Sequence, residues 1–210
     1  MEITRPIAHA HTTVRADLRL AGLALFALAA LFMTGMMLGA SMAEGYDVRN
    51  GAISDLGVAA ETRLMFNVSL IAVGILNVIG GWECYRWHRR RGVLAAFLVA
   101  GIGAAGAGVF PLDSGGLHGL FALGAFVAFN LEPLAIARVV QGPMRWLSVL
   151  AGAVGLAFVV LMVFGDAGNP AVFGPIGHGG AERMIVYPVM LWMMAFGGWL
   201  LAAGETPEAR

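Results

Sequence analysis

The 210-residue chain is 59% hydrophobic and only 12% charged, and its formal net charge is zero. A water-soluble domain is usually about a quarter charged, so this composition excludes an ordinary soluble domain, while the charge balance argues against nucleic acid as a partner. The single cysteine, Cys84, excludes an internal disulfide and a cysteine-based zinc cluster.

Six long apolar stretches fill most of the chain, and short breaks between them hold most of the charged residues. A helix needs roughly 20 apolar residues to cross the hydrocarbon core of a bilayer. We therefore predict an all-α, polytopic membrane protein with one domain at 18–204, between a mobile N-terminal tail at 1–17 and a C-terminal tail at 205–210. The predicted helices are Leu18–Ala40, Leu64–Trp87, Val93–Phe110, Leu117–Val140, Trp146–Phe164 and Arg183–Ala203.

The basic residues, all of them arginine, fall mainly on one side of this arrangement. They precede the first helix, join the second to the third and the fourth to the fifth, and end the chain. Only Arg49, Arg63 and Arg183 fall on the opposite side. Because arginine and lysine accumulate in cytoplasmic loops, we predict a cell-membrane protein with both termini in the cytoplasm.

Three segments predicted to face away from the cytoplasm carry polar residues at helix ends. Ionisable groups beside lipid are costly, so they usually pair with one another or line a functional cavity. We therefore predict that these side chains converge on one polar cluster. Its members are Ser54, Asp55, Asn67, Asp113, His118, Glu182 and Arg183.

Two of these positions carry more specific expectations. His118 lies about one turn into the fourth predicted helix, and steps of seven residues lead to Ala125 and Glu132, so this stripe should face the bundle interior. Glu182 at the start of the sixth helix is explained by the helix dipole, which favours an acidic residue there. Arg183 gains no such benefit and needs a partner such as Asp55, Asp113 or a lipid phosphate.

The same residue types permit two sharper readings. Asp113, His118, His178 and Glu182 are suitable ligands for a divalent metal such as zinc, although Gly179-Gly180 argues against a helix that would place His178 and Glu182 on one face. Without a metal, Ser54 or Ser114 with His118 and an aspartate would form a hydrolytic triad.

Several segments together resemble a known family. They are ISDLGV at 53–58, FNVSL at 66–70, FPLD at 110–113, LHG at 117–119 and GAERMIVYP at 180–188. In this order they are similar to domain-of-unknown-function family 998, particularly to its archaeal-type members, over roughly residues 21–201. The resemblance implies six membrane spans and no particular activity. His178 falls outside the family's pattern, which weighs against the metal.

We expect a non-enzymatic membrane protein whose partner is the bilayer and whose outer polar cluster binds a lipid headgroup, a small ligand or another membrane protein. The alternative is an intramembrane lipid hydrolase or transferase that depends on a metal or on His118, assisted by Asp113 and Glu182. A small transporter ranks third, because Pro133 and Pro188 are the only prolines inside the predicted spans.

Overall fold

The computed structural model describes residues 5–205, and the side chains from Ala16 to Glu205. Within this part of the chain there are six long helices and three short 3₁₀ helices, with no strand. In chain order they are α1 (Arg5–Met42), η1 (Ile53–Gly57), α2 (Arg63–His88), α3 (Arg91–Val109), η2 (Leu112–Ser114), α4 (Gly116–Ile136), α5 (Gly142–Asp166), η3 (Pro170–Ile176) and α6 (Gly177–Glu205).

All six long helices are apolar and long enough to cross a membrane, so the protein is a multi-pass membrane protein. The helical form follows from the solvent, because lipid offers no partners for backbone N–H and C=O groups and a helix satisfies them within the segment. Glycine and proline mark the breaks: Gly115 adopts a φ of 75° before α4, and Pro143 follows Gly142 at the start of α5.

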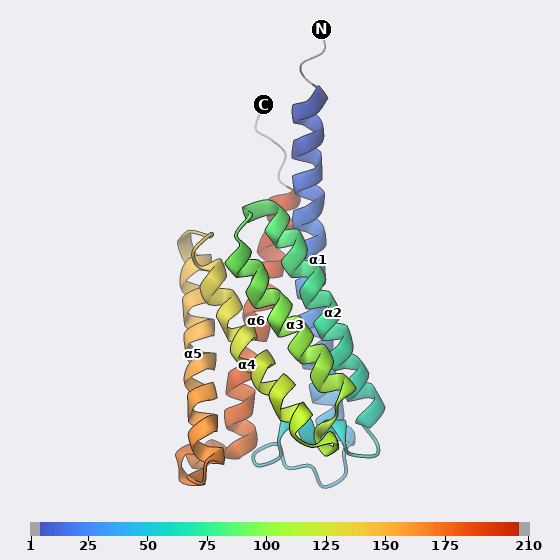
Figure 1. The fold of residues 1–210 in the computed structure, drawn as a ribbon, viewed down its shortest axis with the longest axis vertical. Coiled ribbons are helices and arrows are strands. Elements are labelled where there is room, and N and C mark those ends of the chain that lie inside the picture. Colours follow the sequence, from blue (N-terminus) through green and yellow to red (C-terminus); the bar gives the residue numbers. More distant parts are fainter. Residues whose placement is uncertain (1–4, 206–210) are drawn as a thin grey trace.

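The helices form a ring in which each one packs against its neighbours in the sequence and α6 closes the ring against α1 (Figure 1). Small residues make the closure tight: a Cβ atom added to Gly22 in α1 would lie 2.7 Å from the carbonyl oxygen of Gly197 in α6. Such close approach is how helices associate in lipid, where apolar burial no longer drives them together.

The described start of α1 and end of α6 lie at the same end of the ring, while η1, η2 and η3 lie at the other, which we call the distal end (Figure 1). Every residue of the predicted polar cluster belongs to an element or helix end at the distal end. Because successive helices run in opposite directions, three separate loops lie together at the distal end.

Two predicted helix starts were wrong by more than four residues. Helix α1 begins at Arg5 rather than Leu18, so much of the expected N-terminal tail is helical; the stretch 7–17 contains neither glycine nor proline to stop the helix. Helix α6 begins at Gly177 rather than Arg183, so Gly179 and Gly180 are helical despite their low propensity. Residues 1–4 and 206–210, which hold the rest of both predicted tails, lie outside the described residues.

Candidate functional site

His118 in α4 is the centre of the polar site, and its side chain is only 4% exposed. Its Nδ1 atom lies 2.8 Å from the carbonyl oxygen of Phe110, and its Nε2 atom lies 3.1 Å from Oγ of Ser54. A carbonyl oxygen only accepts, so Nδ1 carries the hydrogen and donates it. In the neutral imidazole Nε2 is then the acceptor, and the Ser54 hydroxyl donates to it.

Ser54 is positioned by η1, whose first residues are held by two carboxylates. Asp55 Oδ2 accepts the Ala52 N–H at 2.8 Å, which caps the 3₁₀ helix locally. Glu182 Oε2 accepts the Ile53 N–H at 2.6 Å and thereby ties η1 to α6 across the bundle. Because Ile53 directly precedes Ser54, Glu182 helps to position Ser54 through the backbone.

A narrow cavity of about 60 Å³ lies inside the helix ring, lined by η1 and by every long helix except α5. Most of its lining is apolar, with Phe66, Phe129 and Val189 among the side chains. Its polar lining residues are Ser54, His118 and Glu182 at the distal end and Asn130 deeper in α4. At 1.5 Å per residue, His118 and Asn130 are about 18 Å apart along the helix, so the cavity is elongated.

Arg183 is buried beside this group, but its partners differ from those predicted. Nη1 donates to the carbonyl oxygens of Val48 and Gly179, at 3.0 and 2.9 Å, and Nη2 donates to the Tyr46 hydroxyl at 2.6 Å. Among the side chains of residues 16–205, Arg183 forms no ion pair, so the expected pairing with Asp55 or Asp113 was wrong. The arginine anchors the segment between α1 and η1 through backbone carbonyls, which are acceptors that a sequence does not reveal.

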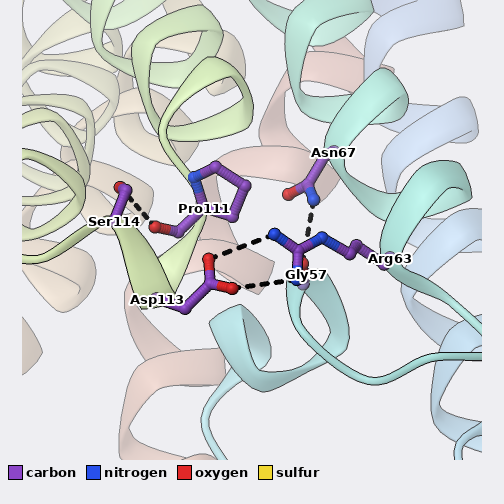
Figure 2. A network of polar contacts seen from close by, with 6 residues as sticks. All are labelled: Gly57, Arg63, Asn67, Pro111, Asp113 and Ser114. Atoms are coloured by element: carbon purple, nitrogen blue, oxygen red, sulfur yellow. Dashed lines mark hydrogen bonds and ion pairs between the residues drawn. The ribbon is translucent and has the colours of Figure 1, made fainter.

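Asp113 does not join the buried group. It pairs with Arg63 at the surface, where Nη1 and Oδ2 lie 2.9 Å apart and both side chains are about half exposed (Figure 2). Ser114 beside it donates its hydroxyl to the Pro111 carbonyl (Figure 2), whereas the hydrogen-bond partners of His118 are Phe110 and Ser54. Asp113 and Ser114 are therefore removed from the predicted catalytic set, because η2 directs them away from the ring interior.

Asn67 has a local role at the start of α2. Its Nδ2 donates to the carbonyl oxygen of Gly57 at 2.8 Å, next to the Arg63–Asp113 pair (Figure 2). It is not among the residues that line the cavity. Asn67 therefore joins η1 to α2 and supports the site indirectly, by holding the end of η1.

The four metal-ligand candidates are dispersed. His178 pairs with Asp166 at 3.2 Å, Asp113 with Arg63, and Glu182 and His118 bind backbone groups. In the part of the chain that the structure describes, no three His, Cys, Asp or Glu side chains lie close enough to hold a metal ion. The residues present do not fit a metal centre, although His178 and Glu182 do lie on one helix.

The predicted stripe on α4 is confirmed. His118, Ala125 and Glu132 are all buried, at 4%, 7% and 0% exposure. Glu132 Oε1 accepts a hydrogen bond from Asn77 Nδ2 at 2.7 Å, well away from the distal end, and neither residue lines the cavity. The Asn77–Glu132 pair is thus a buried polar contact separate from the distal group and from the cavity.

A family model for the description "Protein of unknown function (DUF998)" matches residues 16–199. The chain belongs to this family. The match includes α2 to α5 whole and most of α1 and α6, and it confirms the resemblance seen in the sequence segments. No curated protein and no solved structure matches the DUF998 chain.

Sequence reasoning missed two side chains of this DUF998 site. Asn130 donates to the Ile185 carbonyl at 3.0 Å and joins α4 to α6 at the deeper end of the cavity; an asparagine inside an apolar span was the available signal. Tyr46 accepts from Arg183 and donates to the Ala52 carbonyl at 2.8 Å. Burial raises the pKa of the Tyr46 hydroxyl above its ordinary value, although Arg183 acts in the opposite direction.

Proposed function

We propose that the protein binds a single-chain amphipathic lipid inside the helix ring. The observation that carries this proposal is the shape and chemistry of the cavity: a long apolar passage whose distal end is lined by Ser54, His118 and Glu182. Ligand sites combine an apolar lining with a few placed polar groups that fix orientation, which is the combination found here.

The size of the cavity favours one chain over two. A volume of about 60 Å³ holds roughly four to six water-sized groups, because each needs about 10–15 Å³. That space suits the first few methylene groups of one chain, with no room for a second chain beside it. The polar end offers a hydroxyl, an imidazole and a carboxylate, which match a headgroup with hydroxyl or ester oxygens better than an anionic phosphate.

The position of the site adds to the proposal. The arginine distribution supports cytoplasmic termini, and in that orientation the distal end would face the outside of the cell membrane, with the polar group near the outer headgroups. A lipid whose headgroup rests beside His118 then directs its chain toward Asn130, in the direction that lipid chains of the outer leaflet take.

The test is native mass spectrometry of detergent-purified protein with added monoalkylglycerol, a single-chain lipid that carries free hydroxyls and an ether in place of an ester. We expect wild type to retain the lipid and Ala122→Trp, which places a large ring in the cavity lining, to lose it. The matched control is Ala195→Trp, because Ala195 is exposed on the outer face of α6. Equal retention by wild type and Ala122→Trp would overturn the proposal.

A further inference from the structure

We infer that Ser54 and His118 form a nucleophile–base pair that cleaves or transfers the acyl group of an ester lipid held in the cavity. The inference rests on the proposed lipid binding and adds a reaction to it. It starts from a contact that lipid binding does not require: a serine hydroxyl directed at the acceptor nitrogen of a buried histidine, 3.1 Å away.

The geometry meets the requirements of an activated nucleophile. A base must lie about 2.6–3.2 Å from the hydroxyl and must itself be oriented by a third group. Here the Phe110 carbonyl accepts the Nδ1 hydrogen at 2.8 Å, which fixes the tautomer that leaves Nε2 free to accept a proton. A backbone carbonyl thus takes the place that an aspartate has in a Ser–His–Asp triad.

The surroundings of Ser54 and His118 also differ from those of an ordinary structural hydrogen bond. Both Ser54 and His118 line the apolar cavity, so an ester carbonyl placed at its distal end would lie beside the hydroxyl. The Glu182 to Ile53 bond joins η1, which carries Ser54, to α6. Glu182 is a positioning residue, since it acts on Ser54 through the backbone.

The reaction needs the Ser54 and His118 side chains, an ester lipid and either water or a second lipid hydroxyl. Ser54 Oγ forms a bond to the ester carbonyl carbon while its proton passes to His118 Nε2. The bond from that carbon to the alcohol oxygen then breaks, and the departing alcohol takes the proton from Nε2. The acyl-serine ester is cleaved by water, or by the hydroxyl of a second lipid, whose proton returns through His118 to the Ser54 oxygen.

The experiment uses an alkyl fluorophosphonate, which loses fluoride when a nucleophilic serine oxygen attacks its phosphorus, on the full chain in detergent. We expect a phosphonyl adduct on the peptide that contains Ser54 in wild type, and its absence in Ser54→Ala and His118→Ala. The matched control is Ser114→Ala, which removes an exposed serine at the same end and should leave labelling unchanged. Wild-type release of fatty acid from monoacylglycerol should fall on the order of 10²-fold or more in His118→Ala.

The outcomes separate the two proposals. Ser54→Ala should keep the helical circular dichroism of wild type in detergent, which shows that loss of the adduct is not loss of the fold. Wild type that retains monoalkylglycerol, which has no ester to cleave, but gives no adduct on Ser54 overturns the reaction and leaves lipid binding in place. An adduct on Ser54 without retention of the lipid overturns the proposed ligand instead.

Discussion

Two pairs of polar side chains lie at the distal end of the bundle, one inside the helix ring and one at the protein surface. Ser54 and His118 meet inside the helix ring, and His118 is 4% exposed, whereas Arg63 and Asp113 meet at the surface with about half of each side chain exposed. Ser54 and Arg63 lie between the end of α1 and the first turn of α2, and Asp113 and His118 lie between the end of α3 and the first turn of α4. The comparison shows that charged residues in a membrane protein do not by themselves indicate a functional site, because a solvent-exposed ion pair is a weak structural contact.

Replacing the buried arginine should have the largest effect. Arg183→Ala leaves the Val48 carbonyl and the Tyr46 hydroxyl without their donor, so we expect a loss on the order of 3 kcal/mol in the free energy of unfolding. The matched control, Arg63→Ala, removes an exposed arginine at the same end and should cost about 1 kcal/mol or less. Unfolding in detergent measures both, and equal losses would contradict the contrast between interior and surface.

Changing Glu182 tests how the buried pair is held in position. Glu182→Ala leaves the buried Ile53 N–H without an acceptor, which should cost about 1–3 kcal/mol. Glu182→Gln keeps an oxygen acceptor at the same place and should recover most of that loss. Labelling of Ser54 by the fluorophosphonate should slow in the alanine variant and recover in the glutamine variant; a recovery of stability without labelling would show that Glu182 has no positioning role.

Alkaline pH should weaken the anchor around Tyr46. The folded protein raises the pKa of this hydroxyl, so its contribution to stability is complete below the unfolded pKa of about 10 and is lost as pH rises through the folded value. The free energy of unfolding should therefore fall more steeply in wild type than in Tyr46→Phe between about pH 9 and pH 11. Parallel pH profiles for the two proteins would show that the hydroxyl ionises as it does in water.

The smallest effect belongs to the surface pair. A double-mutant cycle with Arg63→Ala and Asp113→Ala should give a coupling energy of about 0.2–1 kcal/mol. The coupling should shrink as salt is added, because exposed charges are screened. A coupling above this range that resists salt would mean that Asp113 belongs with the buried group after all.

The helices and most of the site were within reach of sequence reasoning. Apolar length predicted all six spans, and the cost of burying ionisable groups predicted that Ser54, His118 and Glu182 would lie at one end. The same reasoning wrongly assigned Asp113 to the cluster, because a residue after a helix end can face either the ring interior or water. It also missed the Phe110 carbonyl and the Val48 carbonyl, since backbone acceptors leave no mark on residue identity.

The amino-acid sequence alone determined that this is a membrane protein, how many helices span the membrane and at which end the polar residues gather. These follow from hydropathy and helix length, which are properties of each segment by itself. The tertiary structure decided which of those residues meet. Closure of the ring between α1 and α6 brings η1 against α4 and α6, so that a serine hydroxyl at position 54 reaches a histidine at 118. That encounter depends on packing between distant segments, and no single segment encodes it.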